Sequence, residues 1–310
     1  MTRRRATLLT PFDPAALGNG SSRRASRWCA ALATQFDVDV VVVPVVASGP
    51  VGGTPIIHRR VELPDDAARR SGAVQLMEPR WRDWMASVSP LPPLADAAPA
   101  WLGRRLMSGS TAISTPDVVV SFKMALAPMA ADLAMAAGDV PLVVDLDDDE
   151  STLAADLGDG ADEVAALERL LRGVASLATV LTAASPADAA SLESRLGRVV
   201  LTAPNVVELP AAVISTTNSR RAMYVANFGY APNSASARWL LHDVMPLVTE
   251  AHTLDIVGIG SEAFGGVGFV PDLDPLYGGA HVVLCPVVAG SGTSVKVIEA
   301  MSHGLSLIHI

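Results

Sequence analysis

Two doubly wound α/β domains in tandem are the fold that this sequence predicts. The chain has 310 residues, enough for two domains that each bury a core of their own. Half of the residues are hydrophobic, only 5% are aromatic, and the apolar content is mostly Ala, Val and Leu, which favours helices packed closely on Val-rich strands. The predicted strands are nearly continuous apolar runs, so we expect parallel sheets covered on both faces.

The first predicted domain covers residues 1–213. It opens with a strand at 6–10, a helix at 21–36 and a Val-rich strand at 38–46, which together make a βαβ unit. Residues 47–115 are rich in Pro and have no regular apolar period, so we expect an insertion there. Alternation then resumes, with strands predicted at 117–121, 141–145, 179–183 and 199–202 and helices at 125–138, 162–177 and 186–196.

A second domain is predicted over residues 222–310. The polar stretch 214–221 has no apolar period and separates it from the first domain. Ligands of such sheets bind at the carboxyl ends of the strands, so we expect a cleft lined by the strand ends of both domains. The predicted strands lie at 222–226, 254–257, 267–270 and 280–285, and the predicted helices at 234–248 and 294–303.

Charge and cysteine content exclude several classes of protein. A net charge of −9 does not fit a non-specific nucleic-acid binder, because phosphates require a basic surface. Cys29 and Cys285 stand in apolar patterns, and we expect two buried thiols in a reducing compartment. The apolar run near the N-terminus is too short for a signal peptide, and no stretch reaches the roughly 20 apolar residues of a spanning helix. We expect a cytoplasmic protein; attachment to a membrane surface stays open.

The most informative run is residues 285–301, which leave a predicted buried strand and open a helix. Gly290 and Gly292 let the backbone approach a ligand, and free amides at a helix start suit phosphate oxygens. Lys296 stands in the first turn, where a cation is unfavourable for the helix itself, so a diphosphate would explain it. Glu299, on the same face, suits a ribose diol. The alternative is a tight turn with a solvent-exposed ion pair between Lys296 and Glu299.

This run resembles the donor motif of the retaining GT-B glycosyltransferases of family four, the group 1 type. The shared features are a proline, a Gly-x-Gly turn, a lysine, Glu-Ala-Met at 299–301 and a final Gly304. The resemblance implies two Rossmann-like domains and a retaining glycosyltransferase of the hexosyltransferase type. Its donor substrate would be a nucleotide-diphosphate sugar, and it would need no cofactor and no metal ion.

The resemblance also implies roles for single residues. Lys296 would contact the diphosphate and Glu299 the ribose, both in the catalytic site. Many family members carry a Glu where this chain has Ser291, and the subgroup with a Gly-x-Gly-Thr turn uses loop amides instead. The expected donor-binding loop is therefore Gly290, Ser291, Gly292 and Thr293.

Three other stretches agree with the family in order along the chain. Residues 222–233, which include Gly229, are similar to the strand and loop that open the family's second domain. Asn205 follows Pro204 as in the element that closes the first domain, with Val206 in place of the family's Gly. Residues 268–271 resemble the base-contacting loop. The resemblance covers almost the whole chain and adds Gly229, Asn205 and Val270 to the expected donor site.

A rival interpretation concerns residues 258–263, which fit the G-x-G-x-x-A pattern of dinucleotide-binding sites. The following residues, 264–268, contain three glycines and break any helix, and the acidic residue expected about 20 positions on is replaced by Gly-Gly-Ala. We favour a simple loop at the end of a strand.

The first domain offers two candidate sites. Gly18, Asn19 and Gly20 lie between the first strand and the first helix, where small residues would admit the acceptor or the donor's phosphates; the alternative is an ordinary turn with Ser21 as N-cap. The arginines that follow, Arg23, Arg24 and Arg27, are expected mostly on a solvated helix face.

The acidic run 145–150 ends a predicted buried strand, and so many carboxylates repel each other unless a cation or hydroxyl groups lie near. A divalent-metal site is one interpretation, but the resembling subgroup carries a similar run without a metal. We expect Asp147 or Asp148 to bind the acceptor hydroxyl, with a solvated loop and helix cap as the alternative. Lys123, which follows the strand predicted at 117–121, is expected to be a surface lysine; the alternative is an electrostatic role in the site.

The predicted activity is transfer of a sugar to a hydroxyl acceptor, in glycan or exopolysaccharide synthesis. The alternatives are a non-catalytic nucleotide-sugar-binding protein and a GT-B sugar-nucleotide epimerase. Trp and Met residues between 77 and 107 would dock a lipid-linked acceptor or a membrane face, or else pack in a local core. Family members continue after Gly304 with further strands, so we expect a C-terminally truncated second domain and an unstable or inactive chain.

Overall fold

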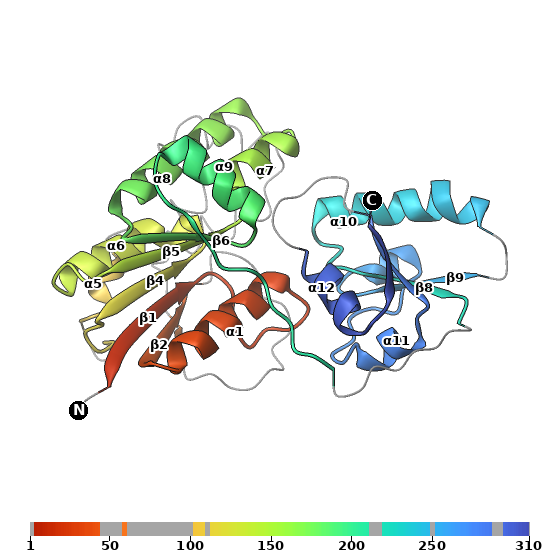
Figure 1. The fold of residues 1–310 in the computed structure, drawn as a ribbon, viewed down its shortest axis with the longest axis horizontal. Coiled ribbons are helices and arrows are strands. Elements are labelled where there is room, and N and C mark those ends of the chain that lie inside the picture. The colour runs from red at the N-terminus through yellow and green to blue at the C-terminus, as the bar shows by residue number, and fades with distance from the viewer. Residues whose placement is uncertain are drawn as a thin grey trace. The chain divides into compact units, whose positions relative to one another are not determined.

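The computed structural model describes residues 3–43, 58–60, 102–108, 112–210, 219–248, 252–286 and 294–309. The chain divides into two compact units (Figure 1). Unit 1 comprises Met1–Ala16 and Ser21–Pro204, and unit 2 comprises Leu17–Gly20 and Asn205–Ile310.

Unit 1 is built on a parallel sheet. Among the described residues its strands follow the order β3-β2-β1-β4-β5-β6-β7, and every neighbouring pair is parallel. The order reverses between β1 and β4, as in a doubly wound fold. The strands are β1 (Arg4–Thr10), β2 (Phe36–Val42), β3 (His58–Arg60), β4 (Val118–Phe122), β5 (Leu142–Asp147), β6 (Val180–Ala183) and β7 (Leu201–Thr202).

Helices cover both faces of this sheet, because its strands are apolar on both sides (Figure 1). The helix α1 (Gly20–Ala33) buries Ala25 and Cys29 against Leu8, Val40 and Val120 on one face. The larger core on the other face contains side chains of three helices, α6 (Ala127–Ala136), α8 (Ala161–Leu177) and α9 (Pro186–Leu196). Both thiols of the chain are buried, as predicted.

Helix boundaries in unit 1 follow local capping chemistry. Ser185 accepts a hydrogen bond from the Asp188 amide, Pro186 occupies the first turn, and Gly197 ends α9 in the left-handed region at φ 66°. Where the sequence predicts a bare acidic run, a further helix α7 (Glu150–Asp156) begins, capped by the Asp149 side chain. Two more elements without a sequence prediction, β3 and α5 (Leu102–Arg105), lie in the range 47–115.

Unit 2 contains a smaller parallel sheet. Its strands follow the order β11-β10-β8-β9 among the described residues. Side chains alternate along β8: Met223 enters one core and Tyr224 the other. The strands are β8 (Arg221–Val225), β9 (Thr253–Val257), β10 (Val282–Cys285) and β11 (Ser306–His309).

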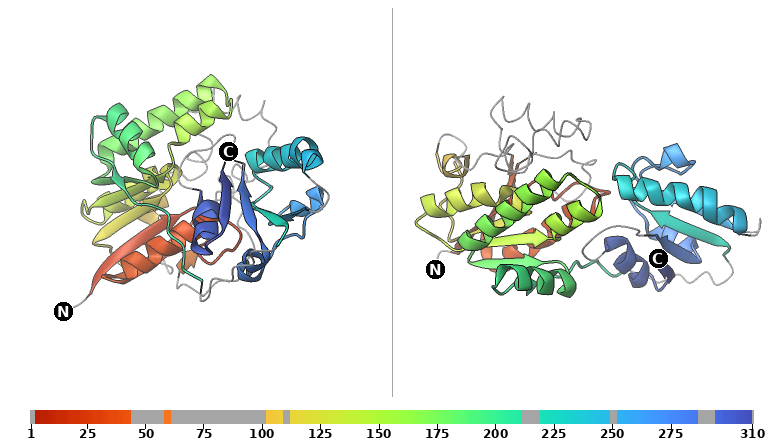
Figure 2. Two further views of the ribbon diagram at one scale, coloured as in Figure 1. Left: turned by 45° about the vertical axis from the view of Figure 1, so that its right-hand side comes forward. Right: turned by 90° about the horizontal axis from the view of Figure 1, so that it is seen from above.

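Helices also pack on both faces of the unit 2 sheet. The core around Tyr224 contains Ala237 of α10 (Ala231–Trp239), and the core around Met223 contains Tyr277 of α11 (Asp274–Gly279) and Ala300 of α12 (Val295–Ser302). The helical path of α10 continues through a π turn (Leu240–Val244) and a 3-10 turn (Met245–Leu247). Figure 2 shows unit 2 from two further directions.

One strand prediction is wrong. Residues 267–270 form no regular strand; Gly265 and Gly268 have φ angles of 73° and 81°, which a strand does not accommodate. The segment is instead held beside β9, where the Val267 amide donates to the Ile256 carbonyl at 3.0 Å. In the described part of the chain, no helix is long and apolar enough to cross a membrane.

Candidate functional site

A buried carboxylate, Asp145, organises the carboxyl end of the unit 1 sheet. Its side chain is 0% exposed and accepts two hydrogen bonds from the Arg24 guanidinium, from Nε and Nη2, each at 2.7 Å. Trp28 Nε1 donates to it at 2.6 Å and Thr182 Oγ1 at 2.8 Å. A bidentate, charge-assisted pair of this kind fixes geometry. Asp145 therefore links α1 to β5 and β6. Its carboxylate oxygens are engaged by these groups of the protein, which gives Asp145 a structural role.

Lys123, directly after β4, is a buried cation. Its ammonium lies 2.8 Å from Asp147 Oδ2, 3.4 Å from Asp148 Oδ2 and 3.9 Å from Glu150 Oε1, and its side chain is 14% exposed. Burial alone would lower the pKa of Lys123, but these carboxylates raise the pKa above its ordinary value. The expectation of a surface lysine is wrong, because the end of β5, the residue after it and the start of α7 place three carboxylates around the ammonium.

The backbone at this point is unusual. Lys123 and Asp147 have φ angles of 72° and 64°, in the left-handed region that non-glycine residues rarely adopt. The register between β5 and β6 shifts between Asp145 and Asp147. Hydrogen bonds from Lys123 N to Asp145 O at 2.9 Å and from Ala184 N to Asp147 O at 2.7 Å hold the bend. The ion pair between the two left-handed residues closes it.

The most accessible carboxylates of this cluster are Asp148 and Glu150. Their side chains are 23% and 24% exposed, against 8% for Asp147, whose oxygens lie 3.2 Å from Arg24 and 2.8 Å from Lys123. Burial raises the pKa of Asp148 and that of Glu150 to about 6 each, although the Lys123 ammonium opposes the shift. These two groups can accept hydrogen bonds from the hydroxyl groups of a ligand.

The acidic run has cationic partners from the protein itself. Arg24 pairs with Asp145 and Asp147, and Lys123 pairs with Asp147 and Asp148. Asp149 caps α7 and pairs with Arg195. Within the ranges that the structure describes, no group of three or more His, Cys, Asp and Glu side chains has a geometry that would hold a metal ion.

Arg24 is a second residue, besides Lys123, that is more buried than the sequence predicts. The arginines of α1 are expected mostly on a solvated face, but Arg24 is only 6% exposed. The available signal was its spacing: Arg24 and Trp28 stand one helical turn apart beside the buried Ala25 and Cys29.

The candidate loop Gly18, Asn19 and Gly20 connects β1 to α1. Gly18 has φ 75°, which explains a glycine there. The helix begins at Gly20, so Ser21 lies inside it and is not the N-cap.

In unit 2, Lys296 stands in the first turn of α12, as predicted. The ammonium donates to Asn233 Oδ1 at 3.1 Å and lies 5.2 Å from the centroid of the Tyr224 ring. The side chain is half-buried, and burial lowers the pKa of Lys296. These contacts differ from a solvent-exposed ion pair with Glu299.

Glu299 is held by a different set of groups. Its Oε2 accepts a hydrogen bond from the Tyr277 hydroxyl at 3.4 Å. The Tyr277 ring stacks on the His303 ring at a centroid distance of 4.6 Å, and His303 Nε2 lies 3.3 Å from Asp274 Oδ1. Glu299 is half-buried and lies on α12 with Lys296.

The other predicted donor residues are spread over unit 2. Gly229 is exposed, and its amide donates to Asn227 Oδ1 at 2.9 Å. Val270 packs against the core that contains Met223 and Tyr277, and Asn205 is half-buried. The predicted donor loop, Gly290, Ser291, Gly292 and Thr293, lies outside the described residues, as do the Trp and Met residues between 77 and 101.

The G-x-G-x-x-A segment is a loop at the end of β9, as favoured from the sequence. A short 3-10 helix (Ser261–Phe264) begins within it, in place of the α-helix that a dinucleotide site requires. Gly258 has φ 129°, and a Cβ there would lie 1.9 Å from the Ala226 carbonyl oxygen. The glycine is explained by close backbone packing.

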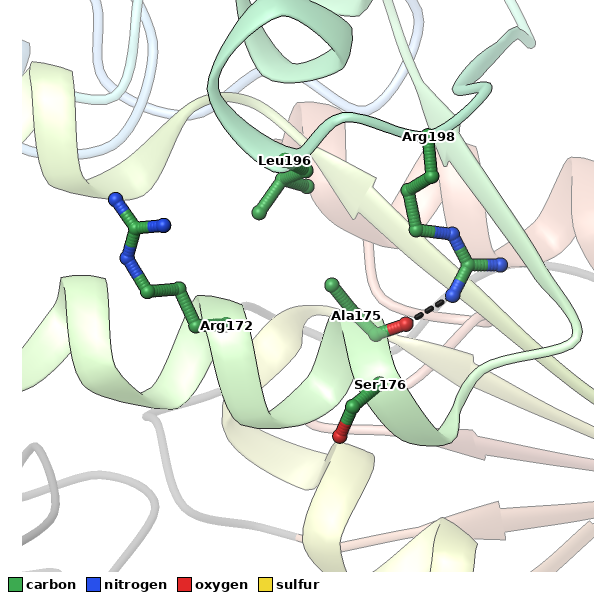
Figure 3. Close-up of a pocket in the computed structure, with 5 residues that line it drawn as sticks. All are labelled: Arg172, Ala175, Ser176, Leu196 and Arg198. Carbon is green, nitrogen blue, oxygen red and sulfur yellow. Dashed lines mark hydrogen bonds between the residues drawn. The ribbon is translucent and has the colours of Figure 1, made fainter.

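A pocket of about 280 Å³ lies elsewhere, beside the C-terminus of α8 (Figure 3). It is lined by Arg172, Ala175, Ser176, Leu196 and Arg198. Arg198 hydrogen-bonds to the Ala175 carbonyl and, at 2.9 Å, to the Ala178 carbonyl, so this arginine caps the helix. The pocket is at the amino end of β6, away from Asp147 and Lys123.

Comparison with known proteins relates the chain to glycosyltransferases. Residues 219–309 match the family model described as "Glycosyl transferases group 1". The fold is GT-B, and the match to the group 1 model lies within unit 2. The predicted GT-B fold class and the resemblance to the group 1 type are thereby confirmed, whereas retention at the anomeric carbon and C-terminal truncation stay predictions. No curated protein matches the chain.

Solved GT-B structures resemble the chain over nearly its whole length. Alr3699/HepE from Anabaena, in complex with UDP and glucose, is 13% identical with a TM-score of 0.62, covering 99% of this chain and 80% of its own. Sucrose-phosphate synthase from Thermosynechococcus elongatus is 15% identical with a TM-score of 0.62, covering 99% and 81%. UGT89C1 from Arabidopsis thaliana, complexed with UDP-L-rhamnose, is 14% identical with a TM-score of 0.54, covering 100% and 79%.

Proposed function

We propose that this GT-B protein is a glycosyltransferase that moves a sugar from a nucleotide-diphosphate sugar to a hydroxyl acceptor. The observation that carries the proposal is the half-buried Lys296 ammonium in the first turn of α12, within the segment that matches the group 1 family. Two of the solved structures described above hold UDP or a UDP-sugar, which makes a uridine nucleotide the first candidate donor.

Stabilisation of the leaving group is the catalytic role that we propose for unit 2. Negative charge grows on the diphosphate as the bond to the sugar breaks, and a fixed ammonium offsets it best where water is excluded. Lys296 supplies that ammonium, and we propose that the amides of Gly290, Ser291, Gly292 and Thr293 add to it. Glu299 would accept hydrogen bonds from the ribose. This arrangement needs neither a cofactor nor a metal ion.

We propose that unit 1 binds the acceptor. Asp148 and Glu150 are the more accessible, half-buried carboxylates of the Lys123 cluster and can accept hydrogen bonds from an acceptor hydroxyl, whereas Asp147 mainly positions them. We propose a glycan or lipid-linked acceptor, with retention at the anomeric carbon and transfer of a hexose. A cytoplasmic location and a role in glycan or exopolysaccharide synthesis belong to the same proposal.

Nucleotide-sugar binding followed by transfer tests this function. We expect at least one member of a panel of UDP-, GDP- and ADP-sugars to raise the melting temperature, and the same donor to release its nucleoside diphosphate when a hydroxyl acceptor is added. Failure of every donor to bind would contradict the proposal. Binding without transfer would indicate a non-catalytic binding protein, and conversion of the donor without an acceptor would indicate an epimerase.

A further inference from the structure

Asn233 links the Lys296 ammonium to the loop that follows β8. The Asn233 side-chain oxygen accepts from Lys296 Nζ at 3.1 Å, while its Nδ2 donates to the Asn227 carbonyl at 2.8 Å. Because a lysine only donates and a carbonyl only accepts, these two contacts settle which end of the amide faces the ammonium.

Asn233 is itself held firmly in place. Its backbone N–H donates to the Tyr230 carbonyl at 3.1 Å, and its backbone carbonyl accepts from the Tyr224 hydroxyl at 3.2 Å. Three residues further along α10, Ser236 donates to the Pro286 carbonyl at 2.6 Å, at the end of β10. The first turns of α10 therefore contact both the chain that leaves β10 and the side chain of Lys296 at the start of α12.

Among the described residues the partners of Lys296 are neutral, which distinguishes this lysine from Lys123. Lys123 has three carboxylates within 3.9 Å of its ammonium. Lys296 instead contacts the Asn233 amide oxygen and the face of the Tyr224 ring. An amide oxygen orients an ammonium and leaves its positive charge in place. A carboxylate would orient the ammonium and also neutralise its charge.

We propose that Asn233 is a positioning residue for Lys296, and that its lack of charge leaves the ammonium able to bind the diphosphate of the donor. This inference rests on the proposed function. Replacement of Asn233 by Asp keeps the size of the side chain but places a carboxylate 3.1 Å from the ammonium, where it competes directly with a diphosphate.

The test compares a nucleoside diphosphate with its uncharged nucleoside. Of UDP, GDP and ADP, the one that binds the wild-type chain most tightly is titrated by calorimetry into the wild type, Asn233→Asp, Asn233→Gln and Lys296→Ala, and the matching nucleoside is titrated in parallel. We expect Asn233→Asp to weaken diphosphate binding about tenfold or more, and Asn233→Gln, which keeps the amide, less than about threefold. Nucleoside binding should stay within about twofold in all of them, a split that a general loss of structure would not produce.

The matched control is His242→Glu, which lowers the net charge of unit 2 as Asn233→Asp does but at an exposed position on the continuation of α10. We expect it to bind both ligands as the wild type does. If far-ultraviolet circular dichroism shows that Asn233→Asp does not fold, Asn233→Ala replaces it, with an expected loss of about threefold for the diphosphate alone.

The outcomes separate the two proposals. Wild-type diphosphate affinity in a folded Asn233→Asp or Asn233→Ala chain, together with a loss in Lys296→Ala, would overturn the role of Asn233 and leave the proposed function standing. Unchanged affinity in Lys296→Ala, or no binding of any of the three diphosphates by the wild type, would overturn the role of Lys296 in the proposed function as well.

Discussion

Lys123 and Asp147, two non-glycine residues with left-handed backbone, face each other across the ends of β4 and β5 and form an ion pair of 2.8 Å. Positive φ angles of 72° and 64° at non-glycine residues cost roughly 1 to 3 kcal/mol each. The surrounding ion pairs and hydrogen bonds offset that cost, so the bend and the charge cluster depend on each other. A cluster of this kind has consequences for stability that urea unfolding can measure.

Removal of the Lys123 charge should be strongly destabilising. Lys123→Met leaves the carboxylates of Asp147, Asp148 and Glu150 without their shared cation, and breaking a buried ion pair costs about 3 to 5 kcal/mol. We expect a loss of that order in the free energy of unfolding at pH 7. The control is Arg172→Met, whose arginine is 65% exposed and pairs with Glu168 at 3.9 Å; we expect less than about 1 kcal/mol there. Similar losses in both variants would contradict the central role of Lys123.

The raised pKa values of the Asp148 and Glu150 carboxyl groups predict an unusual dependence of stability on pH. The pKa of Asp148 and that of Glu150 are about 6 in the folded chain, above the ordinary values of about 4 in the unfolded chain. Between these limits the folded state binds more protons than the unfolded state, so this pair makes stability fall as pH rises from about 4 to about 6.

Asp148→Asn should therefore stabilise the chain at pH 7, by about 1 to 2 kcal/mol, and should flatten the fall between pH 4 and 6. Urea unfolding at a series of pH values measures both effects. Asp156→Asn changes an exposed carboxylate at the last residue of α7 and should leave the slope as in the wild type. A destabilised Asp148→Asn at pH 7 would mean that its charge supports the fold rather than opposing it.

Substitution of two glycines of unit 2, Gly258 and Gly265, distinguishes the cost of a steric clash from the cost of a positive φ angle alone. Gly258→Ala would place a Cβ 1.9 Å from the Ala226 carbonyl oxygen, so we expect a loss of about 3 kcal/mol or more in unfolding free energy. Gly265 also has a positive φ, of 73°, but nothing lies within 4 Å of its Cβ position, and Gly265→Ala should cost only about 1 kcal/mol. Equal losses in urea unfolding would refute the packing explanation for Gly258.

The fold class was predictable because it depends on local pattern. Apolar runs such as 118–120 and 142–144 alternate with helices, and capping residues such as Ser185 and Gly197 set helix ends. The strand expected at 267–270 failed because the apolar pattern does not reveal that Gly265 and Gly268 turn the chain.

The charge cluster of unit 1 was harder to predict, because its partners are distant in sequence. Arg24 and Asp145 are 121 residues apart, and only the strand order places α1 over the end of β5. From sequence alone a lysine beside a polar run is ordinary surface, so Lys123 was misplaced. The placement of Lys296 and Glu299 together on α12 was predictable because that pattern is local in sequence, whereas their roles in a donor site stay predictions.

The central claim is that Lys296 stabilises the departing nucleoside diphosphate more than it holds the intact donor. UDP carries about one more negative charge near neutral pH than a UDP-sugar does, so it reports the charge of the leaving group. The decisive measurement is the affinity of Lys296→Ala for UDP and for UDP-glucose, each relative to the wild type. We predict a loss of about tenfold or more for UDP and less than about threefold for UDP-glucose. Equal losses for the two ligands, or none, would contradict the claim.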